Sequence, residues 1–285
     1  MKKIITALLL VTVLCFCLTS CGSGELSFLA GNTDNTYGIE NGEATVKSVP
    51  NKTIVTEIVI PDEYEGVPVT KIDRFAAVNL EYATKVKIGK NVKEISVWAF
   101  GNSKKITAFE IDDENPYLCD VDGVIFTKDM KTLLFYPPQC GVKTETDEKG
   151  NDVKSISYVI PEGVEVIRSK AFYKCADLTQ ITLPSTLKAI EEKAFFRCNL
   201  KALVLPEALE SIGKDAFAFN AAIKTLTVPA SVKNIDEYAF YSCTSLLEVN
   251  MQGKESDMLL GKKWYPTNNG NELKDPSLVI SWEVG

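Results

Sequence analysis

A repeated segment places the tightest limit on how this chain can fold. The stretch ITLPSTLKAIEEKAF (Ile181–Phe195) returns as YVIPEGVEVIRSKAF, VLPEALESIGKDAF and TVPASVKNIDEYAF, and in weaker form as KIGKNVKEISVWAF. Each copy ends in an Ala-Phe pair, and the last four pairs are spaced by 23, 22 and 23 residues. A fixed period of this length is typical of solenoids, in which each unit is one short element stacked on the next.

Within one repeat, the apolar residues predict a short strand followed by a turn. Leu178, Ile181 and Leu183 form the strand, and Pro184 ends it because proline cannot continue a hydrogen-bonded ladder. The next apolar residues are spaced by three, four and one, which suits a helical or 3-10 turn; they are Leu187, Ile190, Ala194 and Phe195. The prediction is an α/β solenoid with short parallel strands on a concave face and short helical, 3-10 or irregular segments opposite.

The chain divides into four parts around these repeats. Residues 1–20 are predicted as a lipoprotein signal peptide and residues 21–36, which are rich in Gly, Ser, Asn and Thr, as a flexible tether. The repeat domain is expected over 37–251. Residues 252–285 are expected to cap the open end of the core.

One insertion interrupts the repeat domain over residues 112–155. Val124–Thr127 and Thr132–Tyr136 are predicted to pair as a β-hairpin within it. The segment Lys143–Lys154 is charged and almost free of apolar residues, so it is predicted to be an exposed, mobile loop.

The N-terminal segment has the pattern of an export signal. Lys2 and Lys3 precede a mostly apolar run of about 15 residues, which is short for the ~20 that a bilayer span needs. The run ends in Leu-Thr-Ser-Cys, which resembles a bacterial lipobox, whose cysteine becomes the first mature residue and carries lipid. We therefore predict lipidation at Cys21 and anchoring of the exported protein to the cell membrane by two acyl chains. Ordinary signal-peptide cleavage and a retained anchor are the alternatives.

The complete repeat, I-x-L-P…[LV]-x-x-I-x-x-x-A-F-x-x-C-x-x-L, resembles the BspA-type leucine-rich repeat family of bacterial surface proteins. The resemblance covers about Tyr37 to Met251, and DGVIFTKDMKTLLFYPP is similar to the hairpin insert of that family. Two copies depart from the pattern, since Gly89 replaces the proline and Ala77 the phenylalanine. The resemblance implies a horseshoe-like or flatter solenoid, display at the cell surface, and binding of host, matrix or partner-cell molecules. It carries no catalytic residues.

Composition excludes most catalytic chemistry. The chain has no histidine, which removes Ser-His-Asp and Cys-His catalysis and histidine metal ligation. The net charge is −7 and no stretch is densely basic, so nucleic-acid binding is not expected. The carboxylates of Asp112–Glu114, Asp120 and Asp122 are the oxygen ligands that Ca²⁺ prefers, but their spacing matches no calcium loop. We expect no enzyme, no cofactor and no nucleic-acid partner.

The cysteines do not form a disulfide framework. Three of the eight belong to the signal segment and its lipidation site. Cys175, Cys198 and Cys243 each follow the Ala-Phe phenylalanine by three residues, so they fill one repeat position and are predicted to be buried, reduced thiols. Cys119 and Cys140 remain, and the sequence leaves open whether they pair.

Outward-pointing strand residues form the candidate binding surface. Strands of neighbouring coils lie ~4.8 Å apart, so equivalent positions align in straight rows. The central rows are small and uncharged, with two lysines beside them as orienting groups. The predicted partner-binding residues are Thr179, Gln180, Thr182, Lys201, Ala202, Val204, Lys224, Thr225 and Thr227. The alternative explanation of the threonines is that they simply suit strands.

These observations predict a lipid-anchored, extracytoplasmic repeat protein that binds a protein or glycan through its concave sheet, as an adhesin does. The alternative is a structural or scaffolding lipoprotein of an envelope complex without an external ligand. The sequence leaves the oligomeric state and the identity of the ligand open.

Overall fold

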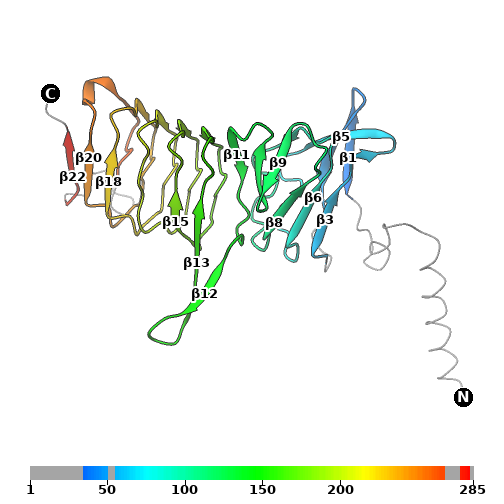
Figure 1. Cartoon of the computed structure of the whole chain (residues 1–285), viewed down its shortest axis with the longest axis horizontal. Coiled ribbons are helices and arrows are strands. Elements are labelled where there is room, and N and C mark those ends of the chain that lie inside the picture. Colours follow the sequence, from blue (N-terminus) through cyan, green and yellow to red (C-terminus); the bar gives the residue numbers. More distant parts are fainter. Residues whose placement is uncertain (1–34, 51–54, 267–276, 283–285) are drawn as a thin grey trace, which may run out of the picture.

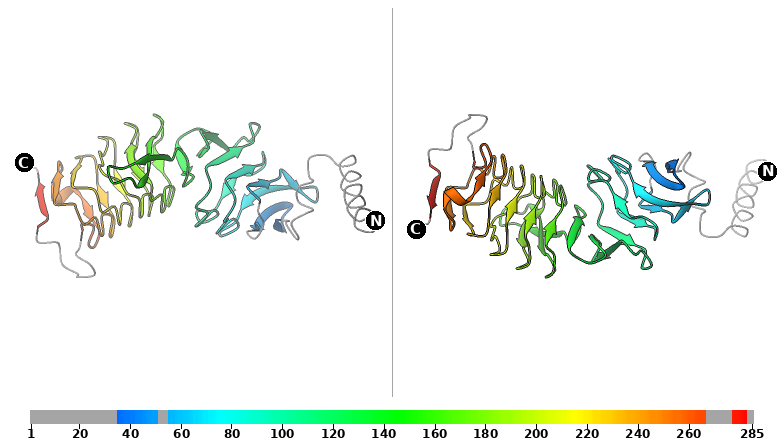
Figure 2. Two further views of the ribbon diagram at one scale, coloured as in Figure 1. Left: turned by 90° about the horizontal axis from the view of Figure 1, so that it is seen from below. Right: turned by 90° about the horizontal axis from the view of Figure 1, so that it is seen from above.

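The computed structural model describes residues 35–50, 55–266 and 277–282. These residues form an elongated β-solenoid, with β1 near one end and β22 at the other (Figures 1 and 2). The predicted signal peptide and Cys21 lie outside the described residues, as does all but the end of the tether. No helix among the described residues is long and apolar enough to cross a membrane.

The first part of the solenoid contains two sheets. One has the order β1-β2-β5-β4, and β7 also pairs with β5. Its strands are β1 (Thr36–Glu40), β2 (Glu43–Ser48), β5 (Val67–Ile72), β4 (Glu63–Tyr64) and β7 (Glu94–Ile95). The other is parallel and comprises β3 (Glu57–Ile60), β6 (Lys85–Ile88) and β8 (Ala108–Ile111). The inward side chains of both sheets share one hydrophobic core.

The second part consists of regular coils with two strand-bearing sides. One side carries β13 (Asp152–Val159), β15 (Leu178–Thr182), β18 (Thr225–Val228), β20 (Glu248–Met251) and β22 (Val279–Trp282). The other side carries two-residue strands that pair in parallel from coil to coil, namely β14 (Val166–Ile167), β16 (Ala189–Ile190), β17 (Ser211–Ile212), β19 (Asn234–Ile235) and β21 (Leu259–Leu260). Each of these two-residue strands adds one inward apolar residue to a second core.

The helical or 3-10 form predicted for the segments opposite the long strands is not confirmed, whereas the irregular form that the prediction also allowed is closer to the structure. Turns and two-residue strands fill that side of each coil, and the single 3-10 helix of the described residues, η1 (Glu255–Asp257), lies outside the Ala-Phe turns. The backbone explains the difference: Lys193 before the Ala-Phe pair has φ 57° and Arg197 after it has φ 56°. Left-handed residues interrupt a right-handed helix, so the N–H groups point to the next coil instead.

The segment between the two cores is part of the solenoid. Strands β9 (Leu118–Val121), β10 (Val124–Thr127) and β11 (Thr132–Phe135) are antiparallel neighbours, and β11 continues in parallel to β14. Ile125 and Phe135 face the first core, whereas Phe126 and Leu133 face the second. The predicted antiparallel pairing of Val124–Thr127 with Thr132–Tyr136 is present as β10-β11. A separate insert over 112–155 is not confirmed, because these strands form a wall that is buried on both sides.

The charged segment Lys143–Lys154 was predicted as a loop and is instead part of a hairpin. β12 (Lys143–Thr146) pairs with the first half of β13 in an antiparallel register, and the hairpin projects from the solenoid (Figure 1). Its side chains are exposed, as expected from their charge. The turn between the strands is closed by the Asp147 carboxylate, which accepts hydrogen bonds from the Lys149 and Asn151 backbones.

The repeated phenylalanine and the repeated cysteine position hold consecutive coils together. Phe172, Phe195, Phe217 and Phe240 are buried and stacked, with ring centroids 4.8, 5.2 and 5.3 Å apart. The thiols of Cys198 and Cys243 donate to the carbonyls of Phe172 and Phe217, one coil back, at 3.2 and 3.3 Å. The position was predicted as packing alone, and the structure adds this hydrogen bond.

Candidate functional site

The exposed side of β13, β15, residues 201–205, β18, β20 and β22 is here called the strand face. Its ladder registers place Val159 beside Thr182, and Thr227 beside Asn250 and then Ser281. A second row runs two residues earlier, where Ser157 pairs with Gln180 and Thr225 with Glu248. The rows predicted from the repeat are therefore present within the parallel ladders β13-β15 and β18-β20-β22.

Most predicted partner-binding residues are exposed on this face. The predicted residues that are exposed are Gln180, Thr182, Lys201, Ala202, Val204, Lys224, Thr225 and Thr227. Apolar side chains share the surface, since Val204 is 81% exposed, Val159 64% and Leu247 51%. These exposed aliphatic groups form no part of either core, which is what a contact surface for another molecule requires.

Thr179 is the exception and corrects the prediction. Its side chain is buried at 6% exposure, and its hydroxyl donates to the Ile156 carbonyl at 3.2 Å. A bulge in the ladder causes this, because Ile156 pairs with Leu178 while Ser157 pairs with Gln180. Thr179 therefore fixes the neighbouring strand and is removed from the candidate contact surface.

The strand face is interrupted at residues 201–205, which form no strand, although Lys201 N–H donates to Thr179 O at 3.0 Å. The coil there is one residue short, since one residue lies between Cys198 and Leu200 and two lie between Cys175 and Leu178. The shortening removes the turn in which Leu178 N–H donates to Cys175 O. Leu200 N–H instead donates to the Asn220 side chain at 3.2 Å, while the Asn220 amide donates to Phe195 O and Phe217 O. Asn220 thus occupies the repeat position that cysteine fills in other coils, where one side chain must both accept a hydrogen bond from Leu200 N–H and donate to backbone carbonyls.

The two strand-bearing regions differ in charge. On the parallel sheet β3-β6-β8, Lys85 pairs with Glu110, and Lys87 with Glu57 at 3.1 Å. On the strand face, neither Lys201 nor Lys224 has an ion pair among the described residues. A partner that covers the strand face therefore needs to displace no internal salt bridge, and the two lysines remain available to it.

A third feature was missed in the sequence analysis. A line of aromatic rings follows the Ala-Phe turns, with Trp98–Tyr173, Tyr173–Phe196 and Phe196–Phe219 centroids at 4.8, 5.2 and 5.2 Å. Basic groups lie over several of these rings, including Lys170 over Trp98 and Arg197 over Phe219 at 4.7 Å. The signal was present in the sequence, because an aromatic residue follows the Ala-Phe pair in most copies.

The carboxylate cluster has structural partners. Asp112 accepts a hydrogen bond from the Glu114 backbone, and Asp120 accepts one from Ile111 N–H at 2.7 Å. Across the part of the chain that the structure describes, no three Cys, Asp or Glu side chains are placed to hold a metal ion.

The five described cysteines are free thiols. Burial raises the pKa of Cys175 and Cys198, and raises that of Cys243 to about 12. Cys119 and Cys140 are partly exposed and have separate neighbours, namely the Met130 sulfur at 3.6 Å and the Asp122 carbonyl at 3.5 Å. None of the five has the low pKa and open surroundings of a reactive thiolate.

Comparison with known proteins agrees with this architecture. The family model for the BspA type leucine rich repeat region matches residues 49–120 and 151–258, with six copies. The unmatched stretch between these ranges contains β10, β11 and β12. No curated protein sequence is significantly similar to the chain.

Two solved structures share the fold. The pneumococcal vaccine antigen PcpA matches with a TM-score of 0.58 and 20% identity over 81% of this chain, which spans 63% of that structure. A leucine-rich repeat protein from Eubacterium ventriosum ATCC 27560 matches with a TM-score of 0.52 and 16% identity, covering 82% of this chain and 84% of that one. At these identities the likeness concerns the fold alone.

Proposed function

Because this chain belongs to the BspA-type leucine-rich repeat family, we propose that it is a surface-displayed repeat protein that binds a macromolecular partner through its strand face. Repeat solenoids of this kind are typically binding scaffolds and not enzymes, because their regular faces present extended rows of side chains. The partner is a protein or a glycan. The observation that supports the proposal best is the set of exposed, uncharged side chains of Val159, Thr182, Val204 and Thr227.

These rows suit close contact. Their side chains are small or aliphatic and stand on backbone that the coil ladder holds rigid, so little conformational entropy is lost when a partner binds. Val204 contributes the largest exposed apolar fraction, 81%, and lies where the ladder is interrupted. Lys201 and Lys224 add unpaired positive charge at the margin, which orients an approaching partner more than it adds affinity.

Anchoring is the second part of the proposal. The Leu18–Cys21 signature supports lipidation at Cys21, and the two acyl chains of a lipidated cysteine are sufficient for stable membrane attachment. Residues 21–36 then act as a tether that holds the solenoid away from the membrane.

The binding surface is tested by Ala202→Arg combined with Thr225→Arg. The partner is first isolated with the full chain from host matrix, envelope extract or a glycan array, and its affinity is then measured by titration. We expect the double variant to bind roughly tenfold more weakly or worse, a loss of about 1.4 kcal/mol, with an unchanged melting transition.

A matched control uses the same residue types away from the strand face. Ala221 and Thr244 are exposed in the turns that precede β18 and β20. Ala221→Arg with Thr244→Arg adds the same charge and should retain wild-type affinity. If this control loses affinity while the strand-face variant keeps it, the strand face is not the binding surface.

The anchor is tested by Cys21→Ala. We expect the variant to move from the membrane fraction to the soluble fraction, or to accumulate as an unprocessed precursor, and mass spectrometry should find no lipid. A variant that stays in the membrane and carries lipid would show that Cys21 is not the lipidation site.

A further inference from the structure

The Ala-Phe turn at Trp98–Asn102 differs from its counterparts in what its backbone meets. Four other turns each donate three N–H groups to the next coil, for example Lys193 to Lys214 O at 2.9 Å, Phe195 to Ala216 O at 2.8 Å and Arg197 to Ala218 O at 2.9 Å. The equivalent N–H groups of Trp98, Phe100 and Asn102 meet no carbonyl in the part of the chain described. Buried N–H groups are normally paired. Phe100 is buried, Trp98 half-buried and Asn102 exposed, so this turn has three N–H groups that no carbonyl of the described residues satisfies.

The wall β9-β10-β11 explains the missing partners. It replaces one regular coil, so the next Ala-Phe turn in space is Lys170–Lys174. The chain between them contributes Tyr136, which donates to Ala171 O at 3.0 Å, and then turns away at Pro137 and Pro138. Pro137 and Pro138 have no N–H, so they donate nothing to the Lys170–Lys174 turn, and no carbonyl of the described residues reaches the N–H groups of Trp98, Phe100 and Asn102. The regular succession of turns is thereby broken at one place.

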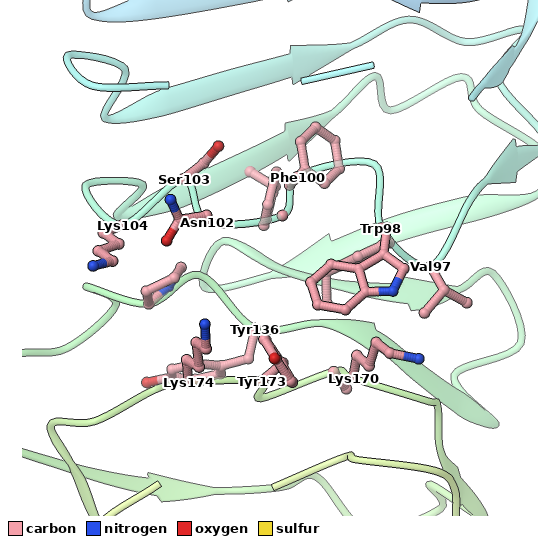
Figure 3. Close-up of a pocket in the computed structure, with 15 residues that line it drawn as sticks. Val97, Trp98, Phe100, Asn102, Ser103, Lys104, Tyr136, Lys170, Tyr173 and Lys174 are labelled. Atoms are coloured by element: carbon pink, nitrogen blue, oxygen red, sulfur yellow. The ribbon is translucent and has the colours of Figure 1, made fainter. Parts of the chain in front are cut away.

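A pocket occupies this place, and Figure 3 shows the two turns facing each other across it. Trp98 and Lys170 lie at one end, where Trp98 contacts the Tyr173 ring at a centroid distance of 4.8 Å. Lys104 and Lys174 lie toward the other end, from opposite turns. Phe100, Phe109 and Phe135 contribute apolar lining.

The charge of the pocket is opposite to that of the chain. Its lining includes Lys104, Lys170 and Lys174 and contains no carboxylate, although acidic residues outnumber basic ones by 38 to 31 in the sequence. Lys170 is 3.6 Å from Glu192. Lys104 and Lys174 have no ion pair among the described residues, and Lys174 lies over the Tyr173 ring at 5.2 Å. The pocket lining therefore offers hydrogen-bond donors and positive charge, and it contains no negatively charged side chain.

We propose that this pocket binds the oxyanion groups of an acidic polysaccharide, as a site distinct from the strand face. Carboxylate or sulfate oxygens accept hydrogen bonds and carry negative charge, so they satisfy both the free N–H groups and the lysines. An acidic peptide suits the site less well, because it brings its own backbone N–H groups. The charged side chains of the lining are all lysines, which donate hydrogen bonds and cannot accept them.

The neighbouring turns extend the same chemistry. Arg197 lies over Phe196 and Phe219 in the following coil, and Arg74 lies over Phe75 at 4.7 Å in the coil before the pocket. Cations thus recur along the edge in different coils, together with carboxylates that pair with lysines, such as Glu192 and Asp215 with Lys193. A linear polymer with regularly spaced negative groups contacts such an edge at several points, whereas a single small anion contacts only the pocket.

The test is titration of the full chain with oligogalacturonate, using neutral galactan oligomers of matched length for comparison. We expect binding of the carboxylated oligomer only, weakened by added salt. Lys104→Ala with Lys174→Ala should weaken it roughly tenfold or more. Lys149→Ala with Lys154→Ala removes the same charge from the β12–β13 hairpin and should leave binding as it is.

Amide resonances give a readout at the site itself. Oligogalacturonate should shift the N–H signals of Trp98, Phe100 and Asn102, and leave those of Lys193, Phe195 and Arg197, which already donate to the next coil. The proposal is overturned by equal binding of the neutral oligomer, by equal loss in both lysine variants, or by unshifted amides at Trp98–Asn102. Displacement by polyglutamate at equal concentration would assign the pocket to acidic peptides, and saturation by free sulfate alone would reduce it to a small-anion site; both outcomes overturn it.

Discussion

Phe195 is wholly buried between two parallel rings, Phe172 at 4.8 Å and Phe217 at 5.2 Å. It therefore contributes both hydrophobic burial and contact across two coil interfaces. We expect Phe195→Ala to lower the free energy of unfolding by about 3–5 kcal/mol, because truncation leaves a cavity that the rigid coils cannot close. Urea denaturation of the wild type and variant measures the difference. A loss below about 1 kcal/mol would contradict the inward position of the ring.

Asn220 compensates for the short coil, and its loss has a predictable cost. Asn220→Ala leaves the Leu200 N–H and the Phe195 carbonyl without their side-chain partner. We expect a loss of about 1–3 kcal/mol in the free energy of unfolding. The control is Cys243→Ala at the same repeat position, where the preceding strand is entered through a turn with its own backbone hydrogen bond, Ile223 N–H to Asn220 O. Denaturation should show the larger loss for Asn220→Ala; an equal or smaller loss would refute the compensation.

Elements contribute unequally to stability, and the β12–β13 hairpin contributes little. Its side chains over 143–154 are exposed and lie outside both cores. Replacement of Asp147–Asn151 by a two-residue Asn-Gly turn keeps the strands paired, so we expect the melting temperature to remain within a few degrees of wild type. Calorimetry tests this expectation. A large decrease would mean that the hairpin supports the adjoining strand β15.

Glu165 links three neighbouring strands of the short-strand side and should make stability depend on pH. Its carboxylate pairs with Lys131 on one side and with Lys188 at 2.7 Å on the other. Hydrogen bonds to these lysines lower the pKa of Glu165 from 4.5 to about 2. A carboxylate with a lowered pKa stabilises the fold above pH 4.5 and loses this contribution as the pH falls toward 2.

The corresponding variant is Glu165→Gln. We expect it to be less stable than wild type at neutral pH, with a difference that shrinks as the pH falls from 4.5 toward 2. Glu207→Gln serves as the control, since Glu207 is exposed and has no ion pair among the described residues. A difference that stays constant with pH would show that the ion pairs of Glu165 contribute nothing.

At the scale of the whole molecule, Arg168 joins the two cores. It projects from the end of β14, donates to Ile95 O at 2.8 Å, and lies over the Phe135 ring at 4.4 Å. Two of its guanidinium nitrogens, Nε and Nη2, are buried without a partner in the described structure. Burial lowers the pKa of Arg168 to about 10. The buried guanidinium therefore destabilises the fold, whereas the aliphatic part of the Arg168 side chain fills the space between the two cores.

We therefore expect Arg168→Met to leave the free energy of unfolding within about 1 kcal/mol of wild type or to raise it, because it removes unpaired buried donors and keeps the volume. Arg168→Ala loses the volume as well and should cost about 2–4 kcal/mol. Chemical denaturation of both variants provides the measurement. If Met is as destabilising as Ala, the charge and not the packing holds the junction.

The sequence by itself determined the period, the positions of the long strands and which residues of neighbouring copies lie side by side. A repeat of 22–23 residues forces each side chain to meet its own counterpart one coil away, so the rows through Val59, Lys87 and Glu110 and through Thr225 and Glu248 followed directly from the copies. The buried phenylalanine and cysteine positions followed for the same reason. Local pattern is sufficient here because nearly every contact is with an adjacent copy.

Only the tertiary structure decided what fills the other side of each coil and where the regularity fails. Apolar spacings of three, four and one fit a helical turn as well as a two-residue strand flanked by left-handed residues such as Lys193 and Arg197. Hydrogen bonds to the next coil stabilise the two-residue strand and its left-handed flanking residues instead of the helical turn. The burial of Thr179, the exchange of partners at Asn220 and the free N–H groups at Trp98–Asn102 all arise where one coil is shortened, bulged or replaced. Such effects depend on which segment of the chain lies next to a given coil. The sequence of a single repeat does not specify that segment.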